Sequence, residues 1–224
     1  MDDTSDPRQR RPRYLPAAAL SLVLLVAMVG VVFAVRGVLQ AHRERNAGSL
    51  RSAPSLSETD RRLLGISGRP AVLWEPEAAR ALGEYLQREL GGAGTEFFEI
   101  NLYTNYAFAT SRDRSDPTVA VHAELRQGQL TTARVSLVGG GRSLPVFGID
   151  DVPWASLGSL MDEAVRRLEV DDADVRYLEI DSGVYGTEGL TIRLYVSGPR
   201  SPGGHVVVDA TGSIVSVVRD GPSA

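Results

Sequence analysis

Residues 96–103 read EFFEINLY, and residues 176–181, eighty positions further along the chain, read RYLEID. Both stretches contain an aromatic residue, a large apolar residue, Glu and Ile in that order. Their alternation of apolar and polar positions is typical of β-strands, with Ile100 and Ile180 on one face and Glu99 and Glu179 on the other. Because the pattern recurs at a distance, it indicates an internal repeat.

An amphipathic helix is expected before each of these strands. The first begins at Pro76, a favoured first helical position, and ends at Gly91 and Gly92. Each helix carries apolar residues at i, i+3 and i+4 spacing, which predicts one apolar side. The apolar positions are Leu82, Tyr85, Leu86 and Leu90 in the first helix, and Leu157, Leu160, Met161, Ala164 and Leu168 in the second.

Three further strands are expected in each copy. The third strands, at 119–125 and 205–210, each lead through a turn that contains Gly to a β-branched run. The second strand of the second copy, at 190–196, alternates cleanly, whereas 106–110 could present either side. The sequence predicts an α+β fold: an N-terminal transmembrane helix, then a tandem repeat of α-β-β-β-β units, with the helices packed on one face of an antiparallel sheet.

Residues 17–35 are apolar apart from Ser21 and Gly30. This length is close to the roughly 20 helical residues needed to cross a bilayer, whereas a cleaved signal peptide has a shorter apolar region. The expected organisation is a disordered cytoplasmic tail over 1–14, a transmembrane helix over 15–36, a juxtamembrane stem over 37–70, a first repeat over 71–141 and a second repeat over 142–224.

Arginines flank the apolar segment in equal numbers, so their count does not decide its orientation. Those before it lie closer together, which favours a cytoplasmic N-terminus and an extracytoplasmic C-terminal domain. They are Arg8, Arg10, Arg11 and Arg13 before the segment, and Arg36, Arg43, Arg45 and Arg51 after it. The chain has no Lys, a bias that together with many Ala and Gly residues favours a bacterial, GC-rich genome.

The composition argues against several functions. Residues 52–224 carry 16 Arg against 24 acidic residues, and nucleic-acid binding needs the opposite balance. The chain has no Cys, and His122 and His205 lack further metal ligands at a recognisable spacing. Residues 139–143 lack the order of a phosphate loop, and no Ser lies in a Gly-x-Ser-x-Gly elbow. The sequence therefore predicts no catalytic residue, metal or cofactor.

The strand face turned away from the helices is the candidate partner surface. Large amphipathic aromatic residues and Arg are enriched at protein interfaces. An ordinary solvated face with cross-strand pairs is the alternative. The candidate partner-binding residues are Phe97, Tyr103, His122, Arg134, Tyr177, Arg193, Tyr195 and His205.

Residues 205–215 read HVVVDATGSIV, a strand that ends in Asp-Ala-x-Gly and is followed by a second strand. This stretch resembles PepSY-type domains, which occur in bacterial envelope proteins and protease propeptides; the first copy keeps only the Gly turn. The tandem layout is also similar to the β-lactamase-inhibitory protein architecture, in which a concave sheet binds a partner protein, although the disulfides usual there are absent. The resemblance implies a noncatalytic extracytoplasmic binding or regulatory module.

The leading hypothesis is a single-pass bacterial membrane protein that contacts the lipid bilayer through residues 17–35 and binds an envelope protein or peptide through its open sheet. A structural or sensor subunit that interacts through the transmembrane helix and stem is the alternative, and an envelope hydrolase is the third. Small residues within 17–35 allow a homodimer without indicating one.

Overall fold

The computed structural model describes residues 72–137, 144–183 and 189–221, all of which belong to one compact unit within residues 51–224. A helix followed by four strands occurs twice in chain order. The elements are α3 (Pro76–Leu90), β1 (Phe97–Tyr103), β2 (Tyr106–Arg112), β3 (Val119–Arg126), β4 (Gln129–Ser136), the short 3-10 helices η2 (Ile149–Asp151) and η3 (Trp154–Ser156), α4 (Leu157–Leu168), β5 (Val175–Asp181), β6 (Thr191–Ser197), β7 (Gly204–Asp209) and β8 (Ile214–Arg219).

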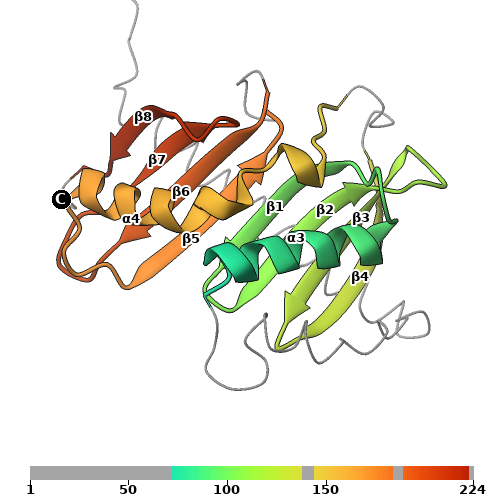
Figure 1. The fold of residues 1–224 in the computed structure, drawn as a ribbon, viewed down its shortest axis with the longest axis horizontal. Coiled ribbons are helices and arrows are strands. Elements are labelled where there is room, and N and C mark those ends of the chain that lie inside the picture. Colours follow the sequence, from blue (N-terminus) through green and yellow to red (C-terminus); the bar gives the residue numbers. More distant parts are fainter. Residues whose placement is uncertain (1–71, 138–143, 184–188, 222–224) are drawn as a thin grey trace, which may run out of the picture. The chain divides into compact units, whose positions relative to one another are not determined.

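All strands of the described residues join one eight-stranded antiparallel sheet in the order β4-β3-β2-β1-β5-β6-β7-β8. The two first strands, β1 and β5, pair at its centre, where Ile100 lies opposite Ile180. These are the two Ile residues that occupy equivalent places in the sequence repeat. Figure 1 shows both α-helices against the same face of the sheet, with the opposite face turned away from the viewer.

The predicted fold class is contradicted in the form given above. Among the described residues no helix is long and apolar enough to cross a membrane, and what they form is mostly one eight-stranded antiparallel sheet with two α-helices. The apolar segment 17–35 lies outside the described residues, as do 1–14 and 37–70. The transmembrane prediction rested on hydropathy, which reports only whether a segment suits a bilayer. The two predicted units share one sheet because β1 and β5 pair.

The helices form where the apolar spacing predicts them. Pro76 occupies the start of α3, whose backbone turns at Gly91 with φ 145°, a conformation that a side chain would disfavour. α4 ends at Glu169, which adopts a left-handed conformation with φ 59°. Gly83 allows α3 to approach η3, because a Cβ there would lie 2.9 Å from the indole of Trp154.

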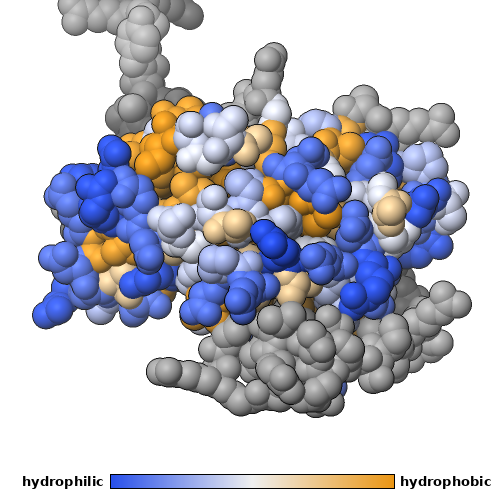
Figure 2. Space-filling model, in the orientation of Figure 1, coloured by the Kyte–Doolittle hydropathy of each residue, from blue (hydrophilic) through white to orange (hydrophobic). Residues whose placement is uncertain are grey.

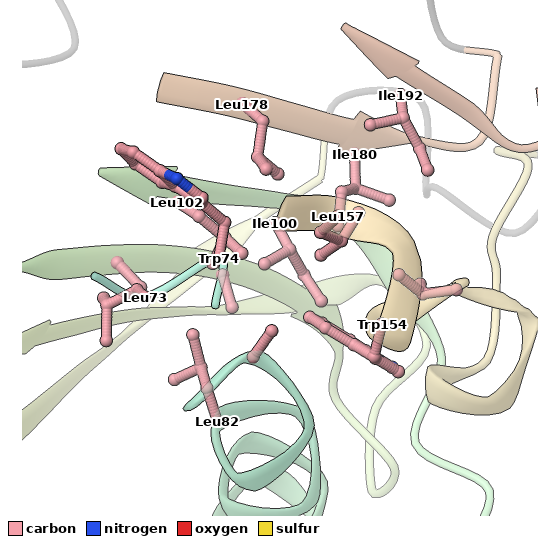
Figure 3. Packing of buried hydrophobic residues seen from close by; sticks show 14 of the residues in the cluster. Leu73, Trp74, Leu82, Ile100, Leu102, Trp154, Leu157, Leu178, Ile180 and Ile192 are labelled. Atoms are coloured by element: carbon pink, nitrogen blue, oxygen red, sulfur yellow. The ribbon is translucent and has the colours of Figure 1, made fainter. Parts of the chain in front are cut away.

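One apolar core lies between the helices and the sheet, and both halves of the chain contribute to it. Figure 3 shows apolar side chains from α3, η3 and α4 directed at those of β1, β5 and β6. Ile100, Leu102, Leu178, Ile180 and Ile192 are each fully buried. Burial of a side chain of this size contributes about 1.5–3 kcal/mol. The core therefore holds the two halves together as one unit.

The two hairpin turns that follow the third strands are built differently. Gln127 and Gly128 both have positive φ, as a two-residue type I′ turn requires. In the second turn, the Asp209 carboxylate accepts hydrogen bonds from the Thr211 backbone at 2.9 Å and the Ser213 backbone at 3.0 Å, and Gly212 has φ 84°. The Asp-Ala-x-Gly motif is thus a carboxylate-stabilised turn.

Figure 2 shows the helix-covered side, where hydrophilic residues predominate and an apolar area lies over the β8 edge. β8 contains Val215 and Val217, which are exposed. No large exposed apolar residue lies on the outward side of α3 or α4. The helices therefore face solvent in the ordinary way, and the candidate site is on the other side of the sheet.

Candidate functional site

The sheet face opposite the helices, called the open face from here on, carries a row of aromatic side chains. Strand register places Tyr103 of β1 opposite Tyr177 of β5, and Tyr177 opposite Tyr195 of β6. Tyr106 of β2 stacks on the other side of Tyr103. These residues, the tyrosine ladder, come from four neighbouring strands and are each partly buried.

The rings of the ladder stack face to face. The centroids of Tyr106 and Tyr103 lie 4.3 Å apart, those of Tyr103 and Tyr177 lie 5.1 Å apart, and those of Tyr177 and Tyr195 lie 4.5 Å apart. Interplanar angles are 9°, 14° and 6°. These spacings match the roughly 4.8 Å between neighbouring strands. The rings therefore project from the sheet side by side, one from each strand.

Both ends of the ladder are capped. The ring of His205 on β7 lies 5.2 Å from that of Tyr195, and the guanidinium of Arg126 lies 4.4 Å from the Tyr106 centroid. The ring faces are therefore occupied by neighbours, and the ladder presents ring edges and hydroxyls to solvent. Recognition of a nucleobase or a sugar by stacking needs a free ring face, which this arrangement does not offer.

Burial controls the protonation of the ladder. Burial, followed by the neighbouring Tyr106 and Tyr177, raises the pKa of Tyr103 to about 12. Burial also raises the pKa values of Tyr177 and Tyr195, with Glu179 adding to the effect on both. The hydroxyls of Tyr103, Tyr177 and Tyr195 stay protonated at neutral pH. Those of Tyr103 and Tyr177 can donate a hydrogen bond to a partner, whereas that of Tyr195 donates to Glu179 and can accept one.

Phe108 of β2 flanks the ladder. Its ring meets Tyr103 edge-on at 6.0 Å and Tyr106 at 5.6 Å, and it stacks on His122 of β3 at 5.8 Å. Nδ1 of His122 lies 3.3 Å from Oγ1 of Thr110. Burial lowers the pKa of His122, so the imidazole is a neutral member of this aromatic cluster at pH 7.

His205 is likewise held neutral, since burial and then Arg193 lower its pKa. His122 lies on β3 and His205 on β7, so four strands separate them in the sheet. Within the described residues no group of three or more His, Cys, Asp or Glu residues could hold a metal ion.

A hollow of about 320 Å³ lies along α3, and its lining residues are Pro76, Glu77, Arg80, Ala81 and Glu84.

Carboxylates gather beside the ladder at the centre of the sheet. Register places Glu99 of β1 opposite Asp181 of β5, and Glu179 opposite Arg193 of β6. The Arg193 guanidinium forms a close ion pair with the buried Asp181, and its Nη1 lies 3.8 Å from Oε1 of Glu179. The open-face positions of β1, β5 and β6 thus hold three carboxylates and one guanidinium.

Glu179 lies in an unfavourable environment for a charge. Burial raises its pKa most, and repulsion by Glu99 adds to this, while Arg193 acts in the opposite direction. The Tyr195 hydroxyl donates to Oε2 of Glu179 across 3.3 Å, and the Asn101 amide donates to Oε1 of Glu99 across 2.5 Å. The carboxylates are therefore positioned by their neighbours on a rigid sheet.

Phe97 does not lie on the open face, and its predicted placement there is wrong. Its side chain is fully buried, 5.9 Å from the ring of Phe147, and its partner in the sheet is Ser111. A register shift between Phe97 and Glu99 marks a β-bulge, which adds one residue to the strand. Simple alternation cannot anticipate such a shift, so counting back from Glu99 gave the wrong face.

Arg134 is also misplaced by the prediction. It pairs with Val121, which shares its face with the buried Ala123. Counting by two from the buried Leu130 puts Arg134 on the helix-covered side, where its Nη2 lies 2.9 Å from Oδ2 of Asp113. The register of β4 against β3, which the sequence does not give, decides the face of Arg134.

The other predicted residues do lie on the open face. Tyr103, Tyr177, Tyr195 and His205 form one row, Arg193 borders it, and His122 joins it through Phe108. Sequence reasoning missed Tyr106, Phe108, Arg126 and Asp181. For Tyr106 and Phe108 the sequence shows aromatic residues alternating with alanines, a pattern that suits either side. The burial of Ala107 and Ala109 in the structure shows that the aromatic residues face outward.

No family model, curated protein or solved structure matches this chain. The resemblance of residues 205–215 to PepSY-type domains therefore stays a prediction, and so does the similarity to the β-lactamase-inhibitory protein architecture.

Proposed function

We propose that this protein is a noncatalytic binding module that takes an envelope protein or peptide on the open face of its sheet. The observation that supports this is the tyrosine ladder. Both described helices lie on the opposite side, and large partly buried aromatic residues cross the middle of the sheet. Tyr is favoured at interfaces because it offers a large apolar body with a polar tip.

Sheet stability alone accounts for part of this arrangement. Each aromatic pair contributes about 0.5–1.5 kcal/mol beyond its buried area. Rings without hydroxyls would stack equally well, yet every ring of the ladder itself is Tyr. Because the stacked rings are already ordered, a partner that hydrogen-bonds to the hydroxyls causes little further loss of side-chain entropy. The ladder is thus suited to binding as well as to stability.

The proposed location is the outer side of a bacterial cell membrane, with a cytoplasmic N-terminus. It is supported by the apolar composition of residues 17–35, by the closer spacing of the arginines before that segment, and by the acidic balance of residues 52–224. Protease added to intact spheroplasts should digest the C-terminal domain. Protection of that domain until the membrane is lysed would contradict this location.

Site-specific photocrosslinking in living cells tests the binding proposal. A photoreactive residue at Tyr177 should capture a discrete partner, whereas one at the exposed Asp162 of α4 should not. Replacement of Tyr195 by Ala should then reduce the yield at position 177. Equal yields at both positions would refute the proposal.

The structural-subunit alternative predicts a different pattern. In that case the crosslinks come from the segment before residue 51 and are unaffected by substitutions in the ladder. One set of strains, with the photoreactive residue placed in turn at Val38 and at Tyr177, separates the two roles.

A further inference from the structure

The charges on the open face are unequal, and their arrangement bears on what could bind there. The charged open-face positions of the three central strands, β1, β5 and β6, are Glu99, Glu179, Asp181 and Arg193. The ladder crosses these same strands, so a segment lying on the tyrosine hydroxyls also meets the carboxylates.

The one guanidinium at these open-face positions, that of Arg193, already forms an ion pair. Arg193 makes its close contact with Asp181, which is 1% exposed. Its distance to Oε1 of Glu179 is 3.8 Å, beyond hydrogen-bond reach. Glu179 instead accepts a long bond from the Tyr195 hydroxyl, at 3.3 Å. The geometry leaves Glu179 with acceptor capacity next to the ladder.

Glu99 adds a second carboxylate on the neighbouring strand. It lies diagonally across from Glu179, because Glu99 pairs with Asp181 and Asn101 pairs with Glu179. Residues diagonally placed across two strands are roughly 7–8 Å apart at Cα, within reach of long side chains. A cation between them would relieve a like-charge contact that the fold itself maintains.

Three kinds of ligand can be compared with this surface. A phosphate-bearing ligand would be repelled by the carboxylates, and the stacked rings offer no free face to a base. A metal ion needs a set of ligands that the described residues do not bring together. A guanidinium or ammonium group on a flexible side chain can reach a carboxylate and pack its stem on ring edges.

We infer that the open face receives a cationic peptide segment, with an Arg or Lys side chain seated between Glu99 and Glu179 and the adjoining backbone along the hydroxyls of Tyr177 and Tyr195. This inference rests on the proposed function and specifies the partner's chemistry. The carboxylates supply charge complementarity, and the ladder supplies a rigid edge on which the Tyr177 hydroxyl can donate a hydrogen bond and the Tyr195 hydroxyl, which donates to Glu179, can accept one.

The probe is a pair of labelled twelve-residue peptides, three repeats of Gly-Arg-Ala-Ser and the same peptide with Gln in place of Arg. Binding to the full-length chain in detergent is followed by fluorescence anisotropy at low and moderate salt. We expect the Arg peptide to bind about tenfold more tightly than the Gln peptide, as one charged hydrogen bond allows. Added salt should reduce this difference.

Three variants locate the binding. Glu179→Gln and Glu99→Gln keep side-chain volume and should each weaken the Arg peptide several-fold while leaving the Gln peptide unchanged. Glu84→Gln, on the exposed side of α3, removes the same charge elsewhere and should have no effect. Thermal unfolding of each variant checks that the fold is intact, so a loss of binding is not a loss of structure.

The inference is overturned if both peptides bind equally, if Glu84→Gln weakens binding as much as Glu179→Gln, or if millimolar Ca²⁺ binds at the same carboxylates and displaces the peptide. These outcomes leave the proposed function testable. If crosslinks from Tyr177 persist in Glu99→Gln and Glu179→Gln, the open face binds a partner of other chemistry. If Tyr177 gives no specific crosslink at all, the proposed function itself fails.

Discussion

Replacing Tyr177 by Ala tests whether the ladder is a cooperative element of the sheet. Tyr177 stacks on Tyr103 at 5.1 Å and on Tyr195 at 4.5 Å, so the substitution removes two aromatic pairs at once. At about 0.5–1.5 kcal/mol for each pair, the loss is about 1–3 kcal/mol before the lost apolar area is counted. Tyr177→Phe keeps both pairs and should cost less than about 0.5 kcal/mol.

Urea denaturation followed by far-UV circular dichroism measures both variants against the wild type. For a folded unit of this size, the Ala variant should also melt at least about 2 °C lower. A double-mutant cycle between Tyr177→Ala and Tyr195→Ala should give a coupling of about 0.5–1.5 kcal/mol. The reasoning is refuted if the Phe and Ala variants are equally unstable, or if the cycle shows no coupling.

Three other predictions concern the core and the titrating groups. Gly83→Ala places a Cβ 2.9 Å from the Trp154 indole and should lower the free energy of unfolding by about 1–3 kcal/mol, measured by denaturation. The phenol of Tyr103 should ionise near pH 12, seen by absorbance at 295 nm in a difference titration against Tyr103→Phe; because this pKa is raised on folding, stability should fall as pH rises from about 10 to 12. Glu179→Gln should melt higher than wild type at neutral pH, since burial raises the Glu179 pKa and the charge is unfavourable there; the advantage should shrink as acid protonates Glu179, and a variant that melts lower at pH 7 would contradict this.

The regular elements were within reach of sequence reasoning, because each carries its own period. Pro76 begins a helix, Gly91 ends it, and the alternation around Ile100 and Ile180 marks two strands. The pairing of β1 with β5 was not predicted. That pairing joins residues far apart in the sequence. Apolar alternation does not reveal it, because a strand at the edge of a sheet and one at its centre show the same alternation.

The candidate site was predicted only in part, because local alternation gives the face of a residue on a regular strand but not the register between strands. Tyr177 and Tyr195 lie on regular strands, so alternation placed them correctly. Phe97 precedes a bulge and Arg134 depends on the register of β4, and neither can be read from local pattern. Stacking of the tyrosines into one row follows from the strand order, which the sequence alone did not supply.

The transmembrane prediction rested on composition only. Residues 17–35 satisfy the hydropathy and length criteria, but they fall outside the described residues, and the described helices are amphipathic. Amphipathic helices cover a sheet because one side is apolar and the other is not. The fold of the described residues, one sheet with two α-helices, therefore does not test whether residues 17–35 cross a membrane.

The bulge at Phe97 limits the open face to one row of stacked aromatic residues. Phe97 is the counterpart of Tyr177 in the sequence repeat. A two-fold rotation about the Ile100–Ile180 pair exchanges β1 with β5, and it would place Phe97 at the position of Tyr177. Without the bulge, an outward aromatic residue at 97 could start a second row on the far side of that pair. Since the bulge turns Phe97 into the core, the near-symmetric sheet carries one tyrosine ladder, and the proposed function therefore predicts one partner per chain in one orientation.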